Sequence, residues 1–366
     1  MRRRTIAHAV MAVGGVVAAG MACADEVQIY GRLYTTLEYN WQSSGNNGQS
    51  TPSTTRMTND RSVWGLRGNE NLGGGYRAIW QIESDLTLPN GAGGMASRDS
   101  RVGLDGPFGT FFLGNWTTPF TESTKAFDPF YPTTAGYMSL MGNGSAPSAD
   151  NVSNTTSFDR RQQNSVNYVS PTWRGLSAAA QWGVNQERVA LSRNPMLLSF
   201  SVTYTAGPLV LTAAQENHRD YQGNHTEDNG TKIGASYRLF AGTVVSAAYE
   251  RLRYQTPTTA VRRDAVYLSL VQRLGPGNLM AGVTWAGNGV GNTKTPIGFI
   301  SSGSETGAMQ YTLGYDYALS RRTSLVAFYS HITNGSRASY NWAINSVPNV
   351  TGGSLSLVAL GMKHAF

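Results

Sequence analysis

The sequence predicts an all-β protein, an antiparallel transmembrane β-barrel of about sixteen strands. Three observations favour this fold. Segments of about ten residues alternate apolar and polar side chains with a period of two. These segments end alternately in a short turn rich in glycine or proline and in a longer polar loop. Downstream of residue 24, no apolar run approaches the roughly 20 residues that a transmembrane helix needs.

The first residues have the pattern of a secretory signal peptide. Three arginines at positions 2–4 precede an uncharged run of apolar and small residues that ends at Ala24. This pattern predicts that residues 1–24 are cleaved off and that residues 25–366 form one mature domain. The only cysteine, Cys23, lies inside the signal, so the mature chain has no disulfide chemistry. A lipoprotein signal at Cys23 is the alternative, but the residues before it match a lipobox poorly.

The composition fits a single β domain, and the net charge is too small for a nucleic-acid-binding surface. The 366-residue chain has a net charge of +7, and three of its positive charges lie in the signal segment, so the remainder is only mildly basic. The mean hydropathy of −0.29 resembles that of a soluble protein. A membrane barrel gives a similar average because only alternate residues face lipid. We find no linker that would divide the mature chain.

The alternation is clearest in the first three segments. One face is apolar and suits lipid: Val27, Ile29, Gly31, Leu33 and Leu37, then Trp64, Leu66, Ala78, Trp80 and Ile82. The opposite face is polar and suits water: Gln28, Tyr30, Arg32, Tyr34 and Glu38, then Arg67, Arg77, Gln81, Glu83 and Asp85. Such segments are typical of strands between lipid and an aqueous lumen.

Short and long connections alternate along the whole chain. The short turns lie at 71–75, 106–109, 171–175, 207–208, 240–242, 275–277 and 320–322. The long polar stretches lie near 40–60, 87–97, 117–159, 185–194, 217–230, 253–263, 287–305 and 335–352. One end of a bacterial barrel carries tight periplasmic turns and the other carries extracellular loops, so this alternation predicts an even number of strands.

Five motifs, in this order, resemble the general porins of Gram-negative bacteria, particularly the β-proteobacterial type. They are Ile29-Tyr30-Gly31, the segment 64–75 (WGLRGNENLGGG), Val102-Gly103-Leu104, the segment 164–171 (NSVNYVSP) and the ending 361–366 (GMKHAF). The resemblance covers essentially the whole mature chain. It implies an outer-membrane homotrimer of sixteen-stranded barrels, each with its own pore.

The resemblance also implies partners and a constriction. The third long loop, roughly 117–159, should fold into the pore and narrow it. The terminal aromatic Phe366 resembles the signal that the outer-membrane assembly machinery reads on the last strand. The expected partners are therefore a homotrimer, outer-membrane lipids and lipopolysaccharide, the assembly machinery, and small hydrophilic solutes and ions. We expect no nucleic acid, cofactor or metal.

Charged residues of the loop and the wall predict the selectivity of such a pore. The acidic candidates in the loop are Glu122 and Asp128, followed by Asp150 and Asp159. The basic candidates occupy polar-face positions of the wall: Arg32, Arg67, Arg77, Arg101 and Arg161. An acidic loop opposite a basic wall sets a transverse field across the lumen. The arginines predict a mild anion preference, although Asn115 stands where the family often has another arginine.

Three other functions remain as alternatives. A channel specific for a sugar or a carboxylate would need an aromatic track, for which only Tyr30 and Tyr34 are available. An outer-membrane hydrolase would need a triad, and the only suggestive cluster is His331, Asn334 and Ser336, where Asn-Gly-Ser is also ordinary turn chemistry. A secreted β-sandwich gives no reason for aromatic strand ends. The function expected is conduction, with no catalytic residue.

The histidines give no metal constellation. His218 and His225 share one acidic loop with Asp220, Glu227 and Asp228, which could bind a surface cation. A solvated loop explains the same residues more simply.

Overall fold

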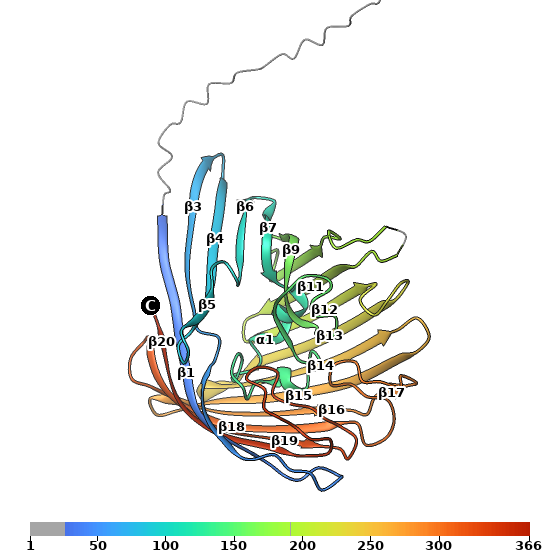
Figure 1. Ribbon diagram of the computed structural model, residues 1–366. Coiled ribbons are helices and arrows are strands. Elements are labelled where there is room, and N and C mark those ends of the chain that lie inside the picture. Colours follow the sequence, from blue (N-terminus) through green and yellow to red (C-terminus); the bar gives the residue numbers. More distant parts are fainter. Residues whose placement is uncertain (1–25, 191) are drawn as a thin grey trace, which may run out of the picture.

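A computed structural model describes residues 26–190 and 192–366, and it shows a β-barrel with one long loop folded inside it (Figure 1). The expected signal peptide, residues 1–24, lies outside the described residues. Sixteen strands build the wall. They are β1 (Glu26–Gln42), β3 (Val63–Gly73), β4 (Tyr76–Thr87), β6 (Ser100–Gly106), β7 (Gly109–Thr117), β9 (Asp159–Val169), β10 (Leu176–Gly183), β11 (Met196–Ala206), β12 (Leu209–Arg219), β13 (Glu227–Arg238), β14 (Thr243–Gln255), β15 (Ala260–Leu274), β16 (Gly277–Ala286), β18 (Ala308–Ala318), β19 (Thr323–Asn334) and β20 (Leu355–Ala365).

Pairing of the first strand with the last closes the barrel. β1 pairs antiparallel with β20 from Arg32 opposite Ala365 to Gln42 opposite Leu355, and its first half pairs with β3. Closure leaves no unpaired sheet edge, which a strand in lipid could not tolerate. No helix within the described residues has the length and apolar character needed to cross a membrane.

Side-chain alternation along the wall confirms the predicted faces. On β1, Val27, Ile29 and Leu37 are exposed on the outside, whereas Tyr34 and Glu38 are buried inside. β3 pairs with β4 in the register that puts Leu66 opposite Ile82, so both strands present their apolar residues outward. The period of two therefore predicted these strands correctly.

The two barrel ends differ as the connections predicted. Short turns such as 207–208 and 275–276 lie at one end, and the longest loop, 118–158, starts from the other. Two predicted long stretches, 217–230 and 253–263, are wrong in extent. Strands β12 to β15 continue into both, so the loops there are only 220–226 and 256–259. Beyond the apolar band the outward residues are polar too, and a polar strand end resembles a loop in sequence.

Four short strands and three helical segments complete the fold. They are β2 (Thr54–Asn59), β5 (Ala92–Gly94), β8 (Ser145–Ala149), β17 (Val290–Gly291), α1 (Pro119–Lys125) and the 3-10 helices η1 (Tyr137–Ser139) and η2 (Phe240–Gly242). Of these, α1, η1 and β8 belong to residues 118–158, which we call the third loop. α1 begins after Thr118, whose Oγ1 accepts a hydrogen bond from the Thr121 N–H at 3.3 Å, and Pro119 occupies its first turn.

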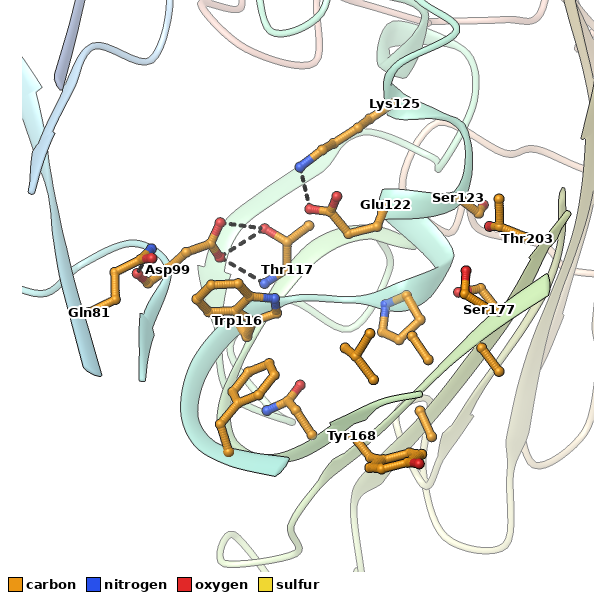
Figure 2. Close-up of a pocket in the computed structure, with 18 of the residues that line it drawn as sticks. Gln81, Asp99, Trp116, Thr117, Glu122, Ser123, Lys125, Tyr168, Ser177 and Thr203 are labelled. Carbon is orange, nitrogen blue, oxygen red and sulfur yellow. Dashed lines mark hydrogen bonds and ion pairs between the residues drawn. The ribbon is translucent and has the colours of Figure 1, made fainter. Parts of the chain in front are cut away.

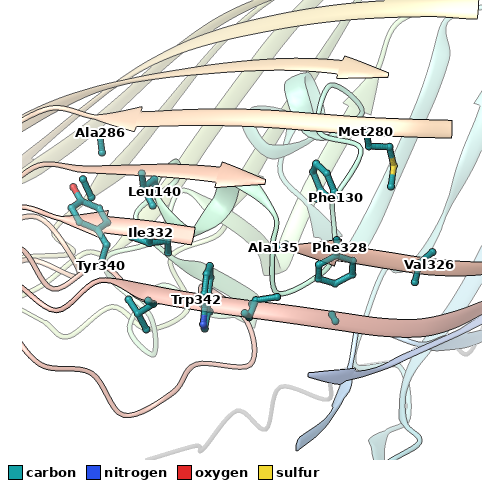
Figure 3. Packing of buried hydrophobic residues seen from close by; sticks show 14 of the residues in the cluster. Phe130, Ala135, Leu140, Met280, Ala286, Val326, Phe328, Ile332, Tyr340 and Trp342 are labelled. Carbon is teal, nitrogen blue, oxygen red and sulfur yellow. The ribbon is translucent and has the colours of Figure 1, made fainter. Parts of the chain in front are cut away.

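Apolar packing holds the third loop against the inside of the wall. Phe130, Ala135 and Leu140 of the loop pack with Val326 and Phe328 of β19 (Figure 3). A second cluster joins loop residues to strands β12, β14 and β15: Phe120, Phe158, Ala214, Leu252, Tyr254, Val261, Ile297 and Ile300. The hydrophobic core therefore lies inside the barrel, between the loop and the wall.

Aromatic rings cover glycines of the first strands and explain the glycine-rich motifs. A Cβ at Gly65 would lie 2.6 Å from the ring of Tyr30, and one at Gly68 would lie 2.7 Å from Trp80. At the seam of the barrel, Gly31 exchanges backbone hydrogen bonds of 3.0 and 3.1 Å with Phe366, whose ring covers the glycine. The close approach requires glycine at these positions.

We predict that Gly31→Val lowers the yield of folded barrel. The new Cβ would lie 2.4 Å from the Phe366 ring and 2.8 Å from the Val63 carbonyl oxygen, so the backbone at the seam must shift. Overpacking of this kind costs about 1–3 kcal/mol. Refolding followed by heat-dependent gel mobility measures the folded fraction. Leu37→Val, an outward position on the same strand, is the control, and equal yields for the two variants would contradict the prediction.

Candidate functional site: the lumen beside the third loop

Hydrogen bonds with charged residues of the wall fasten the third loop on two sides. On one side Arg161 of β9 contacts Asp99 at 2.7 Å and also donates to the carbonyl oxygen of Pro147 in the loop. On the other side Glu250 of β14 accepts from the Gly142 N–H at 2.9 Å. Because both anchors are buried, the loop has a fixed position inside the barrel.

The Glu250 anchor is a buried cluster of three charges. Glu250 lies 3.0 Å from Arg263 and 3.5 Å from Lys232, and all three side chains are at most 1% exposed. Arg263 also donates to the Leu140 carbonyl oxygen, and the Lys232 ammonium lies 4.1 Å from the centre of the Phe120 ring. Every charge in the cluster therefore has a partner from either the wall or the loop.

A cavity of about 490 Å³ lies between α1 and strands of the opposite wall. Glu122 and Lys125 point from α1 into it, and Gln81 and Asp99 face it from the wall (Figure 2). Glu122 and Lys125 form an ion pair with each other. The loop thus contributes one carboxylate and one ammonium to the lumen, in place of the purely acidic face that the sequence predicted.

Arg67 and Arg101 line the lumen on aromatic rings. The Arg67 guanidinium lies 5.0 Å from the centre of the Tyr30 ring, and Arg101 lies 4.5 Å from Trp116 and 4.9 Å from Phe112. Neither arginine forms an ion pair with a carboxylate in the part of the chain that the structure describes. A ring fixes the position of a cation without cancelling its charge, so both remain positive in the lumen.

Two of the other three predicted arginines form ion pairs, and the third binds a backbone carbonyl oxygen. Arg77 is 55% exposed beside a second cavity, where it forms an ion pair with Asp105. Arg32 donates to the Arg61 carbonyl oxygen at 2.9 Å. The Arg161 side chain is only 5% exposed and holds the loop to the wall. The alternation of side chains along a strand places a residue on the lumen side. It does not say whether a carboxylate neutralises the charge of that residue there.

Of the predicted loop carboxylates, only Glu122 lines the described cavities. Asp128 is 4% exposed, and it accepts hydrogen bonds from the Phe130 and Tyr137 N–H groups and from the Tyr267 hydroxyl. We therefore correct its assignment from a pore-lining residue to an internal brace of the loop. Asp150 caps a turn by accepting from the N–H groups of Val152 and Ser153.

Sequence reasoning missed several charged residues of the lumen. Arg98 pairs with Glu83 at 3.0 Å and with Asp85 at 3.1 Å. Asp99 accepts from Thr117 as well as from Arg161. Both residues lie between β5 and β6, in a connection that has no alternation from which to infer a face. Glu83 was on the predicted polar face, but its partner was not.

Several residues behind the alternative functions are enclosed or have structural partners. Tyr34 is 7% exposed, so it offers no surface for an aromatic track. His331 is bonded to the Ser356 hydroxyl at 2.7 Å, and the Asn334 amide donates to two backbone carbonyl oxygens. His218 is buried between the rings of Phe158 and Tyr221. Among the described residues there is no group of three or more potential metal ligands from histidine, cysteine, aspartate or glutamate.

We predict that Asp128 makes the barrel less stable as pH rises through the weakly acidic range. Burial raises the pKa of Asp128 from 3.8 to about 6, so the folded state holds a proton that the unfolded state has lost. The contribution of Asp128 to the free energy of unfolding should therefore fall by ~1–3 kcal/mol between about pH 4 and pH 6. Urea unfolding in vesicles at pH 4 and pH 7 measures this fall.

Asp128→Asn should make this fall smaller by the contribution of Asp128, since an amide does not titrate, whereas Asp60, whose pKa burial raises to about 7, keeps part of the dependence. Asp150→Asn, in the same loop but at a solvated turn, is the matched control and should retain the dependence. An unchanged fall in the Asp128→Asn variant would contradict the contribution assigned to Asp128.

Comparisons with known proteins agree with this architecture. A family model described as Gram-negative porin matches residues 7–337. The chain is 26% identical to "Outer membrane porin protein 32" of Delftia acidovorans, over 100% of both chains. Two solved structures share the fold: the "Anion-selective porin from Comamonas acidovorans" (TM-score 0.77, 21% identity, 93% and 99% of the chains covered) and the trimer form of "OmpT" of Vibrio cholerae (TM-score 0.66, 14% identity, 93% and 99% covered).

The family match extends over most of the chain, and the closed sixteen-stranded wall with its inserted third loop is the corresponding architecture. The chain therefore belongs to the family of Gram-negative porins, the channel-forming proteins of the bacterial outer membrane.

Proposed function

We propose that this porin is a passive diffusion channel for small hydrophilic solutes, with a mild preference for anions. The observation that carries the preference is the state of the lumen charges. Arg67 and Arg101 rest on aromatic rings without a carboxylate partner, whereas Glu83, Asp99 and Glu122 each have a basic partner. Uncompensated guanidinium groups at a constriction attract anions. The Comamonas acidovorans structure, described as anion-selective, has the same fold.

The channel is proposed to conduct solutes without chemical change. The residues of the suggested hydrolase cluster have other partners: His331 bonds to Ser356, and Asn334 fixes the loop backbone through the carbonyl oxygens of Tyr340 and Gly353. Nor does a specific observation favour a sugar- or carboxylate-specific channel.

Single-channel recording of the refolded protein in a planar bilayer tests the proposal. Stable conductance steps and a zero-current potential of the anion-selective sign under a salt gradient are expected. A barrel that folds but gives no steps would refute the pore. Steps with a cation-selective potential would refute the anion preference alone.

We propose further that the working form is a homotrimer made after export and cleavage of residues 1–24. The Vibrio cholerae relative in trimer form supports the oligomer. Phe366 is proposed as the residue that the assembly machinery reads, and the ring's position over Gly31 at the seam is consistent with that role. Chemical cross-linking of the protein from outer membranes tests the trimer, and N-terminal sequencing tests the cleavage.

A further inference from the structure

The outer surface of strands β12 to β15 changes from apolar to basic towards the loop end. On β14 the outward residues run Val245, Ala247, Tyr249, Arg251 and Arg253. On β15 they run Leu270, Leu268, Val266, Asp264 and Arg262. These positions face outward because the residues between them, such as Glu250 and Arg263, are buried inside the barrel. The basic rows therefore form part of the exterior of the barrel and do not line its pore.

Two of the outward arginines stand directly opposite each other. Arg253 pairs with Arg262 in the register of β14 with β15. Directly opposite residues on one face have Cβ atoms about 4.5–5.5 Å apart, and like charges at that spacing destabilise the pair. Within the described chain neither guanidinium forms a hydrogen bond or an ion pair. A bound anion between them would relieve this repulsion.

The nearby carboxylates are already engaged. Asp264 accepts from Arg251 at 2.7 Å and from the Tyr249 hydroxyl at 2.7 Å. Glu227, on the outer face of β13, accepts from the Asn217 amide at 2.7 Å. Asp228 is buried on the lumen side, where it accepts from the Gln255 N–H and the Gln222 amide. With Arg219 also outward at the end of β12, arginines outnumber carboxylates on this rim.

The height of the arginine pair matches the headgroups of the membrane. Tyr249, Val266 and Trp285 lie in one row across β14, β15 and β16. Tyrosine and tryptophan in such a row mark the edge of the hydrocarbon layer. Arg253 follows Tyr249 by four residues, which is ~13 Å along the strand and roughly 9 Å in height at the usual tilt. The strand lengths agree, because β14 has 13 residues and β15 has 15, more than the ~9–11 that cross the hydrocarbon layer.

We propose that Arg253 and Arg262 form a binding site for a phosphate group of the glycolipid in the outer leaflet. Both guanidinium groups donate to the phosphate oxygens, an arrangement that suits the planar donor fork of arginine. The acyl chains of the same lipid lie on the apolar column below, which includes Val245, Val266 and Leu268. The acyl contact distinguishes a lipid from a free phosphate ion, which would use the arginines alone.

Lipid titration of the refolded barrel in detergent micelles tests the site. The probes are bisphosphorylated lipid A, its dephosphorylated form and inorganic phosphate, and native mass spectrometry counts the bound lipid. The wild-type protein should prefer bisphosphorylated lipid A. Arg253→Ala with Arg262→Ala should weaken that binding about tenfold or more, since two charge-assisted contacts are lost. Arg253→Lys with Arg262→Lys, which keeps both charges, should weaken it less.

The matched control is Arg321→Ala with Arg322→Ala, which removes two exposed positive charges from the turn at the opposite end of the barrel. This control should bind lipid A as the wild type does. Equal affinity of the wild type and the Arg253/Arg262 alanine variant, or equal binding of the dephosphorylated lipid, would overturn the proposal. Displacement of lipid A by inorganic phosphate at a similar concentration would indicate a simple ion site and overturn the lipid assignment.

Heat-dependent gel mobility establishes that each variant is folded. Because both arginines lie outside the lumen, the alanine variant should keep the wild-type conductance and zero-current potential. The lipid site and the pore can therefore fail independently: loss of lipid preference leaves the channel proposal intact, and an absence of channel steps leaves the lipid result intact.

Discussion

Replacement of Arg67 and Arg101 by glutamate is expected to reverse the sign of the zero-current potential, from anion-selective to cation-selective. Both guanidinium groups face the lumen on aromatic rings and lack a carboxylate partner among the described residues. A unit charge a few ångströms from a passing ion contributes ~1 kcal/mol in water-like surroundings and more in a narrow pore. Two reversals should therefore change the permeability ratio by roughly tenfold or more.

The reversal must come from the position of the charges and not from the net charge of the protein. Arg321→Glu with Arg322→Glu makes the same change in charge at an exposed turn outside the lumen, and should leave the potential near its wild-type value. Alanine at positions 67 and 101 should give an intermediate result, with little selectivity. If the glutamate variant conducts with unchanged selectivity, the two arginines do not control the narrowest section.

The barrel was predictable because its strands and short turns are determined by residues that are close together in the sequence. The spacing of Val27, Ile29 and Leu37 is enough to predict an outward face. The short turns at 207–208 and 275–276 are predicted by their glycine and proline residues alone. The position of the third loop was inferred from resemblance. It depends on contacts between residues more than a hundred positions apart, such as Gly142 with Glu250.

The site was predictable only in part, because alternation says which face a side chain occupies and nothing about its neighbours. Arg67 and Arg161 both occupy polar-face positions of their strands, yet Arg67 lines the lumen and Arg161 is buried against Asp99. Asp128 looked like a pore carboxylate, but tertiary packing encloses it. Arg98, which pairs with Glu83, lies in an irregular segment where no periodicity exists.

Substitution of Glu250 by glutamine should both destabilise the barrel and release the third loop. Lys232 and Arg263 would lose the carboxylate that both contact, and a buried charge left without its partner costs about 3–5 kcal/mol. The least costly response is for water to enter between the loop and the wall. Since Gly142 and Leu140 bind this cluster, the loop should lose its anchor there.

Two measurements distinguish loop release from a general loss of stability. Urea unfolding should show the lower free energy, and single-channel recording should show higher or flickering conductance, because the loop no longer holds one position in the lumen. Asp264→Asn is the matched control: it removes a carboxylate from the ion pair with Arg251 on the same two strands, but on the exposed outer face, where such pairs contribute at most ~1 kcal/mol. A Glu250→Gln channel with the stability and steady conductance of the control would mean that apolar packing by Phe120 and Phe130 alone holds the loop in place.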